Sequence, residues 1–258
     1  MKERIYTIPV SEAFREDCEC PMCLLEKKLE EDALEYTLGP SMMESDSRIE
    51  TNKKGFCNRH FAKLYNMQKN RLALGLVIDT HLMEQNGVLK KMFEKSLPGL
   101  KKEAASNAVE HIVQGLKGKS ETNALIHSMI EKLSELEKTC TICEKISFNM
   151  GKFTDVILYL FFKEKDFREC FLSKKGFCLY HLKMLLEGTL KYLNQRERTE
   201  FVIALMEMEL VHLDRIKEEV NWFTQKFDYR NEKAPWKNSQ DAIPRSIEKI
   251  CGPSELMR

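Results

Sequence analysis

The sequence predicts an all-α fold made of two tandem helical repeats, each clamped by a metal site of three cysteines and one histidine. Apolar residues recur at every third or fourth position through several long stretches, which is typical of amphipathic helices. A Cys-x2-Cys motif and a later Cys-x2-His motif each occur twice, which indicates an internal duplication. Strand patterns are almost absent: only residues 5–10 look extended, and Pro9 would exclude them from a central strand.

The clearest helix is expected over residues 201–227, because its apolar positions step by three or four residues throughout. These positions are Phe201, Leu205, Met208, His212, Ile216, Val220, Phe223 and Phe227. Residues 126–136 and 146–160 repeat the pattern, and residues 242–250 have the pattern of a short amphipathic helix that Gly252-Pro253 would end. The second half is therefore predicted to be helical almost throughout.

The first half has a similar but less regular pattern. We expect one helix over residues 24–38 and another over residues 60–95, the second bent near Gly75 or Gly87. The sequence Ser96-Leu-Pro-Gly99 is a strong helix breaker and is expected to end it.

The repeat divides the chain into four predicted segments. Between the two halves, residues 100–116 are expected to form a helix despite a thin apolar face, and Gly115-Leu-Lys-Gly-Lys-Ser120 is typical of a turn. The predicted segments are a first metal-binding helical repeat at residues 1–99, a connecting segment at 100–122, a second metal-binding helical repeat at 123–230, and a C-terminal tail at 231–258 that contains the short helix.

The duplication separates the nine cysteines into shared and unshared positions. Lys53-Lys-Gly-Phe-Cys-Asn-Arg-His60 in the first half matches Lys174-Lys-Gly-Phe-Cys-Leu-Tyr-His181 in the second. Cys18, Cys170 and Cys251 have no counterpart in the other copy, so we do not expect them to be ligands. The shared candidates are Cys20, Cys23, Cys57 and His60 in the first repeat, and Cys140, Cys143, Cys178 and His181 in the second.

These residue types and spacings point to metal binding. Thiolate and imidazole together are a common ligand set for structural zinc, and two cysteines separated by two residues can both face one ion. Gly55 and Gly176 precede the third cysteine of each set by two residues and would allow a sharp turn there. A helix is expected to begin at about that cysteine, where its N-terminus would favour a thiolate.

Within each repeat, we expect the early cysteine pair and the later Cys/His pair to converge on one ion. Two zinc ions per chain are predicted, and zinc is favoured over an iron–sulfur cluster because clusters usually take four cysteines. Buried reduced cysteines and redox dithiols are the alternatives that the spacing leaves open. Removing the metal should loosen or unfold each half, since structural zinc contributes about 10–16 kcal/mol.

Composition limits the classes of function. The 41 basic and 40 acidic residues nearly cancel, so no global charge attracts the chain to nucleic acid or to a membrane surface. The N-terminal residues lack the pattern of a secretory signal, and no apolar run is long enough to cross a bilayer. We therefore expect a cytoplasmic protein with an unknown protein partner and an unknown oligomeric state.

No residue pattern is dedicated to catalysis. The sequence has no nucleophile motif and no Gly-rich phosphate loop, so an enzyme is not favoured and no catalytic residue is assigned. His81 and His212 each follow a metal motif on a predicted helix, and we interpret them as core histidines. Two pairs are expected to form ion pairs that brace the loop before the third ligand: Asp46 with Arg48, and Asp166 with Arg168.

Several of these motifs together resemble an uncharacterised bacterial family classed as a domain of unknown function. The residues that carry the resemblance are Ile8-Pro-Val10, Cys20-Pro-Met-Cys23, Ser41-Met-Met-Glu44, Arg48, Thr51-Asn-Lys-Lys-Gly-Phe-Cys-Asn-Arg-His60, Phe227-Asp-Tyr-Arg230 and Pro235-Trp236. The resemblance covers nearly the whole chain and implies a bacterial cytosolic protein with paired Cys/His motifs, without implying an activity.

The sequence therefore predicts a zinc-binding helical interaction or scaffold module with two structural sites. The main alternative is a metal- or redox-responsive sensor, or an enzyme, that uses a labile site of three cysteines and one histidine. Nucleic-acid binding is a further alternative, and it would require a basic face on the folded protein.

Overall fold

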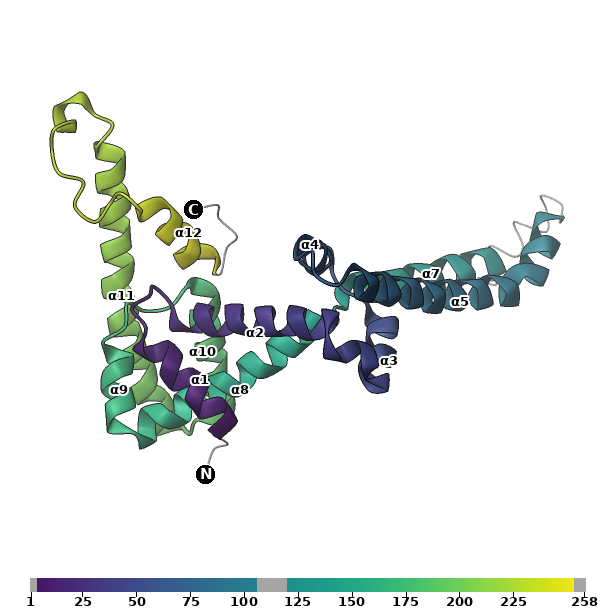
Figure 1. Ribbon diagram of the computed structural model, residues 1–258, viewed down its shortest axis with the longest axis horizontal. Helices are drawn as coiled ribbons and strands as arrows, with labels where there is room; N and C mark the ends of the chain where they lie inside the picture. Colours follow the sequence, from purple (N-terminus) through teal and green to yellow (C-terminus); the bar gives the residue numbers. More distant parts are fainter. Residues whose placement is uncertain (1–3, 106–119, 253–258) are drawn as a thin grey trace. The chain divides into compact units, whose positions relative to one another are not determined.

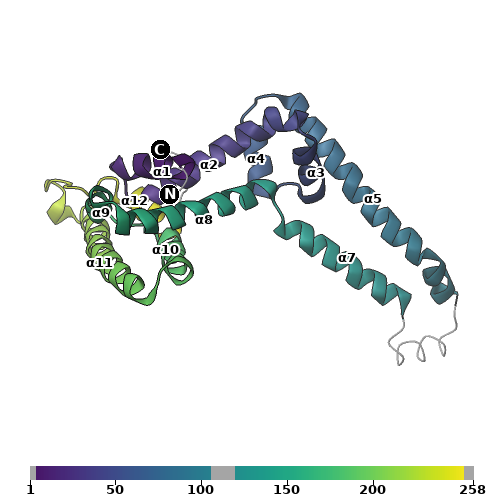
Figure 2. The same cartoon turned by 90° about the horizontal axis from the view of Figure 1, so that it is seen from below.

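The computed structural model describes residues 4–105 and 120–252, and every regular element in these ranges is a helix (Figures 1 and 2). The predicted all-α fold class is confirmed. The elements are α1 (Arg4–Arg15), α2 (Pro21–Leu38), η1 (Pro40–Met43), α3 (Ser45–Lys54), α4 (Asn58–Asn66), α5 (Arg71–Ala104), α7 (Glu121–Lys138), α8 (Thr141–Lys163), α9 (Lys165–Leu172), α10 (Leu179–Tyr192), α11 (Gln195–Gln225), η2 (Tyr229–Asn231) and α12 (Ala242–Cys251).

The chain forms two compact units. The terminal unit contains Met1–Glu30 and Ile146–Arg258, and the central unit contains Glu31–Lys145, so the boundaries fall inside helices α2 and α8. Each unit takes residues from both sequence repeats. The division into four segments that we predict from the sequence repeat stays a prediction.

Five phenylalanines form the core of the terminal unit and hold a candidate ligand loop. They come from α1, α8, α9, α11 and the loop before α10, and all are fully buried: Phe14, Phe161, Phe171, Phe177 and Phe201. Phe161, Phe171 and Phe201 contact one another with ring centroids 4.9 to 5.5 Å apart. The ring of Phe14 stacks on Phe171 at 5.7 Å. Because Phe177 directly precedes Cys178, burial of its ring fixes the position of that thiol.

The central unit is built on the long helix α5. Helix α7 lies beside it in both views, and α3 packs against its first half. Arg48 of α3 donates a hydrogen bond to Thr80 Oγ1 of α5 at 2.9 Å. Phe56, in the loop before α4, is buried and meets the ring of Phe61 edge-on at 5.4 Å.

Most of the predicted helices are confirmed. The long helix predicted at 201–227 is α11, although Phe227 lies beyond its end and is 74% exposed. The other confirmed predictions are residues 24–38 in α2, 126–136 in α7, 146–160 in α8 and 242–250 in α12. Among the described residues, no helix is both long and apolar enough to cross a membrane.

The prediction that residues 5–10 are extended is wrong, because they lie within α1. Val10, Ala13 and Phe14 are spaced three and four residues apart, and all three are buried on one face of this helix. Pro9 lacks one helical hydrogen bond at a cost of about 3 kcal/mol. Burial of a valine and a phenylalanine contributes about 1.5–3 kcal/mol each, which offsets that cost.

The single helix predicted over residues 60–95 is also wrong. Helix α4 ends at Asn66 and α5 begins at Arg71, with left-handed backbone at Gln68 (φ 53°) and Asn70 (φ 41°) between them. The Asn70 side chain accepts a hydrogen bond from Ala73 N and donates one to Leu38 O at 2.7 Å. Asparagine tolerates this conformation, so the break lies there and not at either predicted glycine.

The sequence Ser96-Leu-Pro-Gly99 does not break the chain, because α5 continues through Pro98 to Ala104. Packing against α7 explains this result: a Cβ atom on Gly99 would lie 2.6 Å from Glu121 Cγ. A glycine is therefore needed for close contact between two helices. Residues 106–119, which contain most of the predicted connecting helix and turn, lie outside the described residues.

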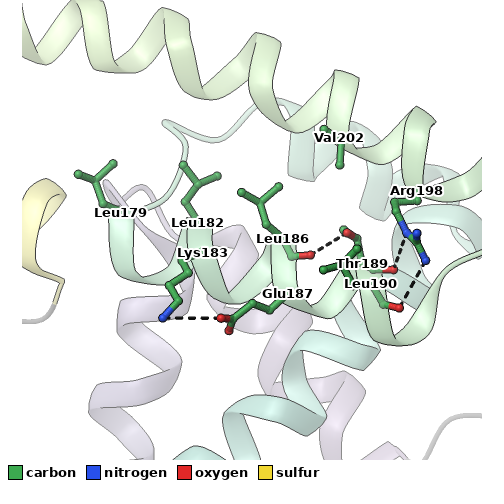
Figure 3. A pocket seen from close by; sticks show the side chains of 9 residues that line it. All are labelled: Leu179, Leu182, Lys183, Leu186, Glu187, Thr189, Leu190, Arg198 and Val202. Carbon is green, nitrogen blue, oxygen red and sulfur yellow. Dashed lines mark hydrogen bonds and ion pairs between the residues drawn. The ribbon is translucent and has the colours of Figure 1, made fainter. Parts of the chain in front are cut away.

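A shallow groove of about 440 Å³ runs along α10 and the start of α11 (Figure 3). Four of its nine lining residues are leucines, and the side chain of Lys183 pairs with Glu187. Arg198 closes one end by donating to the carbonyl oxygens of Thr189 and Leu190. None of the lining residues is a cysteine or a histidine, so we assign the groove no chemistry.

Candidate metal centres

The eight predicted Cys/His residues gather into two groups. We call the first the terminal cluster (Cys20, Cys23, Cys178 and His181) and the second the central cluster (Cys57, His60, Cys140 and Cys143). In each cluster one donor atom per residue lies within 4.8 Å of all the others, so each cluster could hold a metal ion. Two groups of three cysteines and one histidine are therefore confirmed.

The predicted pairing within each repeat is wrong. The Cys-x2-Cys pair of each repeat meets the Cys-x2-His pair of the other repeat. Helix lengths give the physical reason. The 15 residues of α2 beyond Cys23 carry the chain roughly 23 Å away from it, whereas the ten residues of α3 span only about 15 Å. In the second repeat, α8 has 23 residues and α9 only eight. A long outgoing helix followed by a short one does not return the chain to its starting point.

The terminal cluster lies where α2 and α10 begin. Cys20 directly precedes α2, and Cys178 is the N-cap residue of α10. The Nδ1 atom of His181 lies 3.5 Å from Cys20 Sγ, 3.4 Å from Cys23 Sγ and 3.1 Å from Cys178 Sγ. The sulfur atoms of Cys23 and Cys178 are 3.6 Å apart. One imidazole nitrogen thus faces all three sulfurs.

The other nitrogen of His181 faces a carboxylate. Its Nε2 atom lies 3.3 Å from Glu26 Oε2, and both atoms are buried. Glu26 lies on α2, less than one turn after Cys23. A carboxylate behind a histidine fixes the ring orientation and the position of its proton, which is the usual arrangement around metal-bound histidines.

The central cluster lies where α4 and α8 begin, with a similar geometry. Cys57 is the N-cap residue of α4, and Cys140 directly precedes α8. The Nδ1 atom of His60 lies 3.2 Å from Cys57 Sγ, 3.3 Å from Cys140 Sγ and 3.4 Å from Cys143 Sγ. The sulfur atoms of Cys57 and Cys143 are 3.8 Å apart. The predictions that one helix begins at about Cys57 and another at about Cys178 are both confirmed.

The glycine before each third cysteine has the predicted role. Gly55 has φ 63° and Gly176 has φ 85°, conformations that other residues rarely adopt. Both glycines also lie directly against a side chain of the following long helix. A Cβ atom on Gly55 would lie 2.7 Å from the His81 ring, and one on Gly176 would overlap Glu209 Oε2.

Side chains of α5 hold the ligand loop of the central cluster. His81 Nδ1 lies 2.8 Å from the carbonyl oxygen of Asn52, to which Gln85 Nε2 also donates at 3.0 Å. Gln85 donates to the carbonyl oxygen of Lys53 as well, at 3.1 Å. His81 therefore has a loop-anchoring role and is not a ligand.

In the terminal unit this role belongs to Glu209 and not to His212. Glu209 Oε2 accepts a hydrogen bond from Phe177 N at 2.7 Å, and Lys249 Nζ donates to the carbonyl oxygen of Lys175 at 3.0 Å. The two side chains are fully buried and pair at 2.8 Å. The spacing of Glu209 from buried Leu205, four residues earlier, signals its burial in the sequence, whereas no sequence signal identifies Lys249.

The predicted Asp/Arg pairs do not brace the loops. Arg48 contacts α5 through Thr80, and Arg168 pairs with Glu200 of α11 at 2.8 Å. Both arginines thus bind the long helix that follows their own ligand loop. The prediction of ion pairs with Asp46 and Asp166 is wrong, because the long helices supply nearer partners.

Hydrogen bonding divides the charge within each cluster. Hydrogen bonds from Cys20, Cys23 and His181 lower the pKa of Cys178 far below its usual range. Burial opposes ionisation of Cys140, but hydrogen bonds to His60 and to the backbone of Cys143 lower the pKa of Cys140 to about 6. Burial and the neighbouring thiol of Cys140 raise the pKa of Cys143 to about 12. Each cluster thus favours a thiolate at its centre.

The three unshared cysteines lie outside both clusters, as expected. Cys170 Sγ donates to the carbonyl oxygen of Phe14 at 2.9 Å, and Cys251 is exposed at the end of α12. Cys18 is half-buried, and its burial raises its pKa to about 11. All nine cysteines are free thiols.

The fold and the clusters define an all-α protein with two Cys/His groups that could each hold a metal ion. The chain belongs to a family of unknown function, DUF6062, whose model matches residues 1–256. This confirms the resemblance seen in its motifs.

The name of a curated relative does not assign a function either. The chain is 31% identical over 101 residues to an uncharacterized 23.9 kDa protein in the xynA 3' region of Caldicellulosiruptor sp. (strain Rt8B.4). The match covers 39% of this chain and 46% of that protein, so the chain spans about half the length of its relative. No solved structure matches the chain.

Proposed function

We propose that this is a zinc-binding protein in which two structural zinc ions hold together a helical interaction or scaffold module. The donor-atom spacing carries the proposal. A tetrahedral zinc ion with Zn–S bonds of about 2.3 Å and Zn–N bonds of about 2.0 Å separates its sulfurs by about 3.8 Å and sulfur from nitrogen by about 3.5 Å. The clusters have sulfur pairs at 3.6 and 3.8 Å and sulfur–nitrogen pairs at 3.1 to 3.5 Å.

The same spacing favours zinc over an iron–sulfur cluster. In an iron–sulfur cluster, several iron and sulfide ions lie between the cysteine ligands and hold the cysteine sulfurs farther apart than a single zinc ion does. Each group also offers four protein ligands, which is the complete set of a structural zinc site. The carboxylate of Glu26 behind His181 supports this assignment for the terminal cluster.

Zinc in these positions would join distant parts of the chain. The terminal cluster links the start of α2 to the start of α10, and the central cluster links the start of α4 to the start of α8. Structural zinc contributes about 10–16 kcal/mol, which is comparable with the whole stability of a domain. The ions would therefore be part of the fold, and nine free cysteines are consistent with a reducing, cytoplasmic compartment in a bacterium.

An exposed aromatic pair supports the interaction role. Lys226 Nζ donates to the carbonyl oxygens of Asn231, Glu232 and Ala234 at 2.6 to 2.8 Å, which uses all three of its donors. Beside this ordered loop, Phe227 and Tyr229 are 74% and 84% exposed. Aromatic side chains held on a fixed loop are typical of protein-binding surfaces.

Elemental analysis and an absorption spectrum of protein purified without oxygen test the proposal. We expect two zinc ions per chain and a colourless sample. A brown sample that contains iron would show that the sites hold an iron–sulfur cluster and not zinc. A folded protein without metal would refute the proposal altogether.

A further inference from the structure

The two clusters differ in their exposure to solvent. In the terminal cluster, Cys20, Cys178 and His181 are buried and Cys23 is half-buried. In the central cluster, by contrast, the sulfur-bearing residue Cys143 is exposed. Because both clusters have the same ligand types and spacing, this difference comes from what covers them.

Helix α12 covers the terminal cluster. Gly252 ends this helix and is buried so close to the cluster that a Cβ atom on it would lie 3.5 Å from Cys178 Sγ. The buried pair of Lys249 with Glu209 holds α12 against α11. Lys249 also donates to the loop that carries Cys178, so the helix and the ligand loop are fixed to each other.

A second set of ion pairs fixes the other end of α12. Arg245 Nη1 lies 3.2 Å from Glu19 Oε1 and 2.5 Å from Glu219 Oε2, and Arg215 pairs with the same two carboxylates. Glu19 directly precedes Cys20 of the terminal cluster. The cover is thus attached next to the first ligand as well as next to the third.

In the central cluster, two sulfurs are accessible and adjacent. Cys143 is exposed and Cys57 is half-buried, and their sulfur atoms are 3.8 Å apart. Accessible zinc-bound thiolates are the ones that oxidants reach first. We propose, resting on the zinc function above, that Cys143 and Cys57 form a redox-sensitive pair that a hydroperoxide converts to a disulfide with release of the central zinc ion.

The chemistry balances with hydrogen peroxide, the simplest hydroperoxide, as the oxidant. Bound zinc would keep Cys143 as a thiolate despite its raised pKa. This thiolate attacks one peroxide oxygen, the O–O bond breaks, and a sulfenic acid and a hydroxide ion form. The Cys57 thiolate then attacks the sulfenic sulfur, forming the S–S bond and expelling a second hydroxide. Two thiolates lose two electrons and the peroxide gains them. Two protons from solvent convert the hydroxides to water, and zinc leaves because two of its four ligands are lost.

Hydrogen bonds that do not depend on the metal would keep the two ligand-bearing segments of the central cluster together after zinc has left. Thr141 N donates to the carbonyl oxygen of Gly55 at 3.1 Å, and Thr139 Oγ1 donates to that of Lys54 at 3.0 Å. One backbone bond and one side-chain bond thus join the loop before Cys57 to the residues at the start of α8. The cluster should therefore reform when a thiol reductant and zinc are supplied.

The test uses the full zinc-loaded chain treated with hydrogen peroxide, with released zinc followed by a chromogenic chelator and disulfides mapped by mass spectrometry. We expect one zinc ion to leave about tenfold faster than the other, together with a disulfide between Cys57 and Cys143. Dithiothreitol with added zinc should restore two ions per chain. Loss of both ions at one rate, earlier loss from the terminal cluster, or a first disulfide without Cys143 would overturn the inference.

Two variants serve as controls. Cys251→Ser removes an exposed thiol outside both clusters and should leave both release rates unchanged. Arg245→Ala should loosen α12 and speed release from the terminal cluster only; an unchanged terminal rate would show that α12 is not its cover. A chain that holds two zinc ions but loses them together refutes this inference alone, whereas a chain that binds no zinc refutes the proposed function as well.

Discussion

Paired cysteine substitutions distinguish the observed pairing of motifs from pairing within each repeat. The structure places Cys20 and Cys178 in one cluster and Cys57 in the other. In the double variant Cys20→Ser with Cys178→Ser, both changes damage the same site, so we expect one zinc ion per chain to remain. In the double variant Cys20→Ser with Cys57→Ser, each change damages a different site, so we expect none. Pairing within each repeat predicts the reverse result for both variants.

The expected difference is one full zinc equivalent, which inductively coupled plasma mass spectrometry resolves easily. Each single variant should keep one ion, because three remaining ligands bind zinc more weakly than four. Dialysis against a mild chelator before the measurement removes weakly bound zinc. The reasoning is refuted if Cys20→Ser with Cys57→Ser keeps one ion while Cys20→Ser with Cys178→Ser keeps none.

Three further predictions concern residues around the clusters. In a denaturant titration, Gly176→Ala should lower the free energy of unfolding by about 2–3 kcal/mol, because φ is 85° and the new methyl group would meet a buried carboxylate. The control Gly75→Ala, on an open helical face, should raise the free energy of unfolding by up to about 1 kcal/mol. Glu26→Ala should weaken zinc binding at the terminal cluster about 10- to 100-fold in a competition assay, because His181 loses its buried carboxylate; an unchanged affinity would show that Glu26 does not orient the ring. Burial, and then the charge of a neighbouring arginine, lower the pKa of His212, so the unfolded chain binds a proton at this residue more tightly than the folded chain and folding stability is lost as pH falls below about 6.5. Thermal melts at pH 7.5 and 5.5 should therefore show a smaller drop in melting temperature for His212→Gln than for the unchanged chain.

Sequence periodicity predicts helices well where side-chain burial alone decides the structure. Phe201, Leu205 and Ile216 are all buried on one face of α11, as their spacing indicates. Local breakers are less reliable, because Pro9 and Pro98 both lie inside helices. At these positions burial or contact with another helix outweighs the local preference, and neither is visible in a short window of sequence.

The duplication identifies all eight cluster residues, but it does not determine how they combine. A repeat shows which residues are equivalent, whereas the path of the chain decides which of them meet. The predicted helix over residues 24–38 already uses almost half of the chain between Cys23 and Cys57. Comparing the lengths of the outgoing and returning helices would have indicated the interchange. Glu209 shows a similar limit, since its burial follows from helical spacing but its partner Lys249 lies in the distant tail.

Separation along the chain is a weak obstacle to the interchanged pairing. Cys23 and Cys178 are 155 residues apart, and His60 and Cys140 are 80 residues apart. Pairing within the first repeat would close a loop of only 34 residues, from Cys23 to Cys57. Because each doubling of a closed loop costs only about 0.6 kcal/mol of entropy, the longer closure is less favourable by roughly 1.3 kcal/mol. Zinc binding contributes about 10–16 kcal/mol, which is far larger. The entropy of closing a longer loop therefore cannot enforce pairing within a repeat, and the lengths and directions of α2 and α8 decide which ligands meet.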